Sequence, residues 1–146
     1  MSRPSPWNGI LESLHSALID ALIEEFPDIK PELGMPIRRD AWSLEPDVTR
    51  MVVHELTCEQ GQALAAIGIN DAAHAALKKR PTSSPEKFLE LLMRRAEPDF
   101  KRRGLSVTSR SADLTATSIS PTRVIWIPLR ISQKNDALVF HLGIGI

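Results

Sequence analysis

The chain has 146 residues, 42% of them apolar and 25% charged, which is the composition of one ordinary globular domain. Its 18 Lys and Arg residues balance its 18 Asp and Glu residues, which argues against a dedicated nucleic-acid binder and against electrostatic attachment to a membrane. The single cysteine excludes an internal disulfide framework, and no apolar run is long enough to span a membrane. Residues 1–6 lack a signal-peptide pattern, so we expect a cytoplasmic protein.

The N-terminal part of the chain predicts a tail, one long helix and a connector. We expect residues 1–7, rich in Pro and Ser, to be a flexible tail, and residues 8–146 to form a single domain. Apolar residues recur at helical spacing and predict a helix over residues 8–26. Four prolines and a glycine in residues 27–47 predict a connector, with a short edge strand around residues 37–44.

A β-hairpin and a short helix are predicted next. Val and Thr dominate residues 48–57, which favours a strand, and residues 62–69 form a short apolar run next to glycines, which favours a second, buried strand. A hairpin is the simplest way to join the two strands. Asn70 or Asp71 is then a suitable N-cap for a helix over residues 72–80.

A second helix is predicted over residues 84–97. Ser84 is its expected N-cap, and Pro85 suits the first helical position because a proline there loses no helical hydrogen bond. Pro98 is expected to kink or end this helix, and Gly104 closes the segment.

The last forty residues change to the alternating pattern of strands. We expect three antiparallel strands, within residues 105–118, 123–131 and 137–146, and Pro128 suggests that the middle one is an edge strand or contains a bulge. The predicted fold class is therefore α+β, an antiparallel sheet with helices packed on one face. Because the closing strand is apolar, a homodimer that covers its edge is expected.

Charge is distributed unevenly along the neutral chain. Residues 1–33 carry six acids and two bases, a net charge of −4, whereas residues 78–110 carry ten bases and four acids, a net charge of +6. One interpretation is a solvated basic helix face opposite the acidic helix. The other is a local field that attracts an acidic partner.

No pattern for metal, cofactor or nucleophilic chemistry is present, so neither a metal nor a cofactor is expected. No two histidines share the spacing that places metal ligands on one helix face. Cys58 has no base nearby in sequence, and its neighbour Glu59 would raise the pKa of the thiol. The histidines are therefore interpreted as ordinary surface or partly buried residues: His15, His54, His74 and His141.

The predicted second helix carries the most distinctive polar surface. Helical spacing places five residues on one side of it, which is either a solvated face or a surface that docks onto a protein partner. These candidate partner-binding residues are Glu86, Glu90, Met93, Arg94 and Glu97.

The order of elements resembles the CheC/CheX family of chemotaxis phosphatases, whose domain is related to part of the flagellar switch proteins. An amphipathic helix and a Pro/Gly connector precede a hairpin around Gly61 and an alanine-rich helix at residues 70–79. A further helix and the closing strands 124–131 and 138–146 follow. The resemblance implies a CheX-like fold and a phosphorylated response regulator as the protein partner.

The family's active helix carries an acid, an asparagine three residues later, and an Asp or Ser four residues before the acid. Here Glu90 takes the position of the acid and is the candidate catalytic residue, while Glu86 takes the upstream position. The asparagine, which positions water in the family, is replaced by Met93. Methionine offers only a weak thioether acceptor and cannot orient water.

The resemblance thus predicts a CheX-like binding or adaptor module in bacterial two-component, chemotaxis or motility signalling, without the full phosphatase chemistry. Two alternatives stay open. One is an active phosphatase that acts on the aspartyl phosphate of a response regulator through Glu90 and another polar group. The other is a small secretion chaperone that binds a client segment along an apolar groove. Nucleic-acid binding through residues 94–103 is disfavoured by the scarcity of aromatic residues.

Overall fold

The computed structural model describes residues 6–27, 31–41, 47–59, 61–80, 84–112, 121–132 and 137–146. In this part of the chain seven strands form one antiparallel sheet in the order β1-β6-β7-β4-β3-β5, and β2 also pairs with β6. The elements are α1 (Pro6–Glu25), β1 (Glu32–Leu33), β2 (Ile37–Arg39), β3 (Arg50–Cys58), β4 (Gly61–Ile69), α2 (Asp71–Lys78), α3 (Pro85–Arg102), β5 (Thr108–Ala112), β6 (Val124–Ser132) and β7 (Ala137–Gly145).

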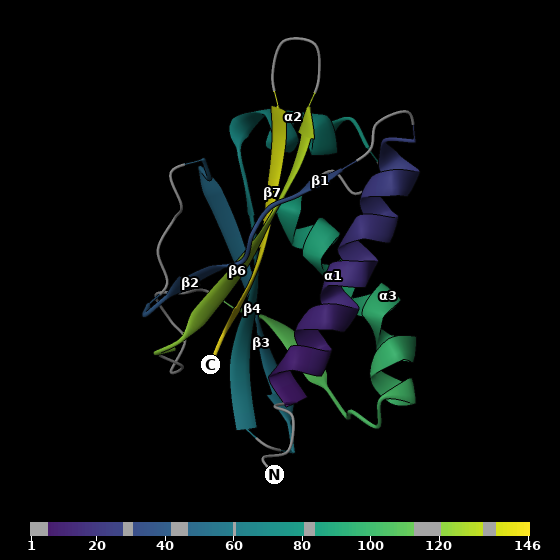
Figure 1. The fold of residues 1–146 in the computed structure, drawn as a ribbon. Helices are drawn as coiled ribbons and strands as arrows, with labels where there is room; N and C mark the ends of the chain where they lie inside the picture. The colour runs from purple at the N-terminus through teal and green to yellow at the C-terminus, as the bar shows by residue number, and fades with distance from the viewer. Residues whose placement is uncertain are drawn as a thin grey trace.

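The three helices share one core with one face of the sheet. Figure 1 shows α1 and α3 side by side next to the sheet, and α2 near one end of it. Leu18 of α1, Leu77 of α2 and Phe88 of α3 are fully buried in the same cluster as Ile67 and Phe140 of the sheet. Each such side chain contributes about 1.5–3 kcal/mol through burial. The predicted α+β class, with helices on one face, is confirmed.

The opposite face of the sheet has its own small apolar cluster around Trp126. The indole packs with Val53 and Ala66, and all three side chains are buried. It also lies directly on Gly143 of the neighbouring strand, where an added Cβ would stand 2.7 Å from two ring carbons. Glycine is required at this position because any larger residue would displace the ring.

The hairpin was predicted correctly. β3 and β4 pair along their full length, from Arg50 opposite Ile69 to Cys58 opposite Gly61. Gly61 has a φ of +135°, a conformation that glycine adopts without strain, which is why the turn contains a glycine. The pairing places alternate side chains of β3 on opposite faces of the sheet, so His54 and Glu55 point to different sides.

Several helix boundaries differ from the predictions, and α2, for example, ends at Lys78 rather than at residue 80. α1 begins at Pro6, two residues earlier than predicted, because proline is well tolerated at a first helical position. α3 does not end at Pro98 but continues to Arg102. Buried Phe100 anchors the last turn to the core, and Gly104, with a φ of +71°, then ends the helix.

Pro128 lies in β6, which is flanked by β7 on one side and by the short strands β1 and β2 on the other. The carbonyl of Pro128 accepts a hydrogen bond from the Gly34 amide, 2.9 Å away, on the side of β1 and β2. In a strand, the backbone nitrogen and the carbonyl of one residue point to the same side. The nitrogen of Pro128, which carries no hydrogen, therefore also faces β1 and β2. There β1 pairs with residues 129–130 and β2 with residues 124–126, so Pro128 falls between the two ladders.

The expectation that the closing strand would be an edge was wrong. β7 lies between β6 and β4 and pairs with both. It is buried on both faces, which explains why its sequence is an almost continuous apolar run. The argument for a homodimer through this strand therefore fails, because its hydrogen-bonding groups are already paired within the chain. Parts of the strands predicted over residues 37–44 and 105–118 lie outside the described residues.

Candidate functional site

Helix α3 is set in place by its first turn and by its apolar side. The Ser84 side chain accepts a hydrogen bond from the Lys87 amide at 3.2 Å, and Pro85 occupies the first position, both as predicted. Phe88, Leu92 and Ala96 are buried toward the core. This anchoring determines which residues of the helix face solvent.

Four of the five candidate partner-binding residues are exposed on α3. They form the outer face of the helix: Glu86, Glu90, Arg94 and Glu97. The side chains of Glu90 and Arg94 are 49% and 78% exposed and approach each other to 4.0 Å, a weak contact between solvated charges. Met93 is different, because it is 8% exposed and belongs to the core. It therefore does not belong to the exposed surface that the other four residues form.

The outer face carries charge in two rows. Helical geometry places Glu86, Glu90 and Glu97 on one side of the face, and three bases, seven residues apart, on the other. Ion pairs cross between the rows, as for Lys101 and Glu97 at 3.4 Å. The bases of the second row are Lys87, Arg94 and Lys101, all exposed.

Two other bases of this region pair with the acidic first helix within the same chain. Arg95 donates to both carboxylate oxygens of Glu24, one of them at 3.1 Å. Arg80, just after α2, lies 3.5 Å from Glu25. These pairs support the interpretation that the acidic and basic halves lie opposite each other, and they leave less unpaired positive charge to attract a partner.

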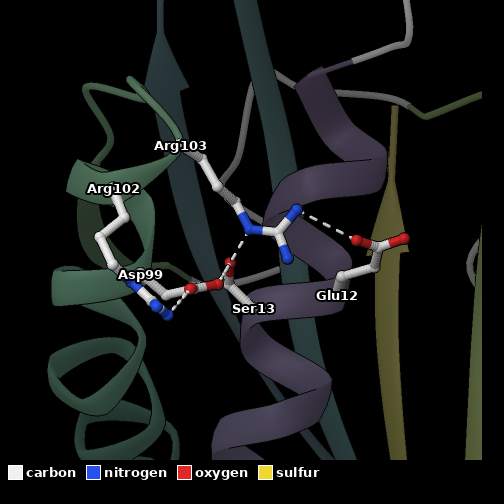
Figure 2. A network of polar contacts seen from close by, with 5 residues as sticks. All are labelled: Glu12, Ser13, Asp99, Arg102 and Arg103. Atoms are coloured by element: carbon white, nitrogen blue, oxygen red, sulfur yellow. Dashed lines mark hydrogen bonds and ion pairs between the residues drawn. The ribbon is translucent and has the colours of Figure 1, made fainter.

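A polar network joins the C-terminal part of α3 to α1 (Figure 2). The Asp99 carboxylate accepts hydrogen bonds from the hydroxyl of Ser13 and from Arg102 and Arg103, and Arg103 also reaches Glu12 at 3.0 Å. The hydrogen bond from Ser13, followed by that from Arg103, lowers the pKa of Asp99 to about 2. Asp99 therefore stays charged at neutral pH and helps to hold α3 in a defined orientation on α1.

A hollow of about 330 Å³ lies between the first turn of α3 and the sheet. It is lined by residues 51–54 of β3, Glu86 of α3, and Ser111 and Ala112 of β5, and is named here the His54 pocket. His54 is 6% exposed, and its Nδ1 atom is buried without a hydrogen-bond partner among the described residues. Burial lowers the pKa of His54, against the smaller opposing effect of Glu90, so the imidazole is neutral at pH 7.

The sequence did not single out this histidine. The signal available was its place in β3, where alternation puts it on the same face as Leu56 and the helices. Its neighbour Glu55 faces the other side and pairs with Arg110 at 2.5 Å. Glu90 and Glu86 were named from the helix alone, and their proximity to His54 depends on how α3 packs on the sheet.

The described residues contain no group of three or more His, Cys, Asp or Glu side chains suited to hold a metal ion. Within the same ranges, none of the helices combines the length and the apolar character that crossing a membrane requires.

No family model matches the sequence, and no curated protein matches it. Solved structures do match in fold. The chemotaxis protein CheX from Desulfovibrio desulfuricans aligns with a TM-score of 0.63 at 12% identity, over 92% of this chain and 97% of that chain. A chain of the CheX–CheY–BeF3–Mg²⁺ complex from Borrelia burgdorferi aligns with a TM-score of 0.57 at 15% identity, over 98% of both chains.

The FliM middle domain from Vibrio alginolyticus aligns with a TM-score of 0.50 at 12% identity, over 95% of this chain and 92% of that chain. All of these identities are low, so the likeness concerns the fold. It extends over nearly the whole length of each chain compared, and it confirms the resemblance that the order of elements had indicated. The protein has the α+β fold of the CheC/CheX chemotaxis proteins.

Proposed function

We propose that this protein is a CheX-like binding or adaptor module in chemotaxis or motility signalling, which docks a protein partner on the outer face of α3. The observation that carries the proposal is the fold, which matches CheX structures over 92% or more of this chain. One matching chain was solved in a complex of CheX with CheY, beryllium fluoride and magnesium. By analogy, the partner proposed here is the phosphorylated receiver domain of a chemotaxis response regulator in the cytoplasm.

The two rows of charge on α3 suit a specific protein contact. Glu86, Glu90 and Glu97 oppose Lys87, Arg94 and Lys101, so a partner with the reverse pattern is favoured and one with like charges is repelled. The core and the Asp99 network hold this face in one orientation. A rigid, preoriented face loses little conformational freedom on binding.

Binding without efficient catalysis is the favoured form of the proposal. Hydrolysis of an aspartyl phosphate requires a water molecule to be positioned, because the phosphoryl group and its metal ion belong to the partner. Met93, at the position of the family's asparagine, offers only a thioether and is buried. Glu90 is exposed and would be the candidate catalytic residue of the alternative, an active phosphatase.

One experiment separates these functions. A purified chemotaxis response regulator is phosphorylated, and the loss of its phosphate is followed with and without this protein. The retention of the regulator by the immobilised protein is measured in parallel. Specific retention of the phosphorylated form without faster dephosphorylation is the expected result. Faster dephosphorylation would establish the phosphatase alternative, and absence of both effects would refute the proposal.

A further inference from the structure

The His54 pocket lies beside the acidic row of the outer face. Glu86 belongs to both, since it is the first member of that row and also lines the pocket. Val52, which packs toward the helix side of the sheet, adds apolar surface, and Ser111 of the neighbouring strand β5, opposite His54, adds a hydroxyl. The pocket therefore combines an apolar wall with a carboxylate and two further polar groups.

His54 is the unusual member of this pocket. The residue is only 6% exposed, yet its buried Nδ1 atom has no hydrogen-bond partner among the residues that the structure describes. Buried polar groups in folded proteins are nearly always paired, and an unpaired one is a candidate for a ligand. A neutral imidazole has one nitrogen that accepts a hydrogen bond and one that donates.

We propose that the His54 pocket binds the side chain of a lysine or arginine residue of a protein partner. The aliphatic stem of such a side chain would lie against Val52, and its charged end would pair with Glu86. The neutral imidazole of His54 and the hydroxyl of Ser111 would accept hydrogen bonds from the same group. The inference rests on the proposed function for the identity of the partner, but its test does not.

Other occupants fit the pocket less well. An acidic side chain would be repelled by the like charge of Glu86 in the pocket. Glu90 would add to this repulsion, because it lies close enough to His54 to affect the pKa of the imidazole. A purely apolar side chain would leave Glu86 and His54 without partners while displacing water from them. Among protein side chains, a base with a long aliphatic stem satisfies both the apolar wall and the carboxylate.

The test uses Nα-acetyl-lysine amide as the probe and follows the His54 imidazole by NMR at pH 7.5. The uncharged Nα-acetyl-norleucine amide, which lacks the ammonium group, is the matched control ligand. We expect a saturable shift of the His54 resonances with the lysine probe and no saturable shift with the control. Equal shifts with both ligands, or no saturable shift with the lysine probe up to its solubility limit, would overturn the proposal.

Two variants locate the binding. Glu86→Gln replaces an exposed side chain and keeps its shape, so it should leave the fold intact and weaken lysine-probe binding about fivefold. Glu59→Gln makes the same change after the far end of β3 and should leave binding unchanged. Unchanged affinity in Glu86→Gln would show that the probe binds elsewhere and would refute the proposed site.

This test is independent of the proposed function, because the probe titration contains no response regulator. If the lysine probe binds but the regulator is not retained, the pocket stands and its basic side chain comes from a different protein. If the regulator is retained but the probe does not bind, the docking proposal stands and this inference fails.

Discussion

The docking proposal makes a quantitative prediction for the double variant Glu90→Ala/Arg94→Ala. The two side chains are 49% and 78% exposed and 4.0 Å apart at i,i+4 spacing. Such a pair contributes about 0.3–0.5 kcal/mol to stability, and the higher helix propensity of alanine offsets part of that loss. The melting temperature should therefore change by less than about 2 °C. If the pair lies at the centre of the interface, retention of the regulator should weaken about thirtyfold or more.

The matched control is Met93→Ala, on the buried side of the same helix. Met93 is 8% exposed and packs in the core, so its truncation should lower the free energy of unfolding by about 2 kcal/mol or more. The folded fraction of this variant should still bind the regulator as the native chain does. Thermal melts by circular dichroism and binding isotherms measure both quantities. A double variant that melts much lower while keeping its affinity would refute the proposed orientation of α3.

Three further predictions concern the fold. Gly143→Ala should destabilise the protein by about 1–3 kcal/mol, because the new Cβ would stand 2.7 Å from the ring of Trp126. In a Trp126→Phe background the loss should be smaller. Equal losses in the two backgrounds, measured by denaturant melts, would contradict this contact. Asp99 has a pKa lowered from 3.8 to about 2, so its charged form stabilises the fold above about pH 4, and this contribution is lost as the pH falls toward 2. The stability difference between the native chain and Asp99→Asn should therefore be constant above pH 5 and shrink below pH 4, and a difference that grows in acid would refute the assignment. Deletion of residues 137–146 should abolish cooperative folding, because β7 pairs with both β4 and β6; a truncated chain with a single sharp melt would show that the sheet order is wrong.

Local signals in the sequence were sufficient to predict most of the elements, though not β1, and several of their ends. Ser84 caps α3 as expected, and Asn70 rather than Asp71 caps α2, accepting a hydrogen bond from the Ala73 amide at 2.9 Å. Capping, helical spacing and strand alternation depend on residues a few positions apart, so a single sequence contains them. The resemblance to the CheC/CheX family rested on the order of these elements and was therefore accessible from the sequence too.

The functional surface was predictable only in part. Glu86, Glu90, Arg94 and Glu97 were assigned to an exposed face from helical spacing, and they are exposed. Met93 was assigned to the same face but is buried. Its position lies at the border between the polar and apolar sides of α3, where spacing does not decide the direction. The direction depends on how α3 packs against α1 and the sheet.

The sequence by itself predicted the three helices and every strand except the two-residue β1 (Glu32–Leu33), because helices and hairpins are stabilised by contacts between near neighbours. Only the tertiary structure decided that β7 is central, that Glu24 of α1 pairs with Arg95 of α3, and that Glu86 and His54 line one pocket. These arrangements join segments tens of residues apart. They are determined by which apolar faces pack together, and the period of a hydrophobic pattern shows that a face is buried without showing what covers it.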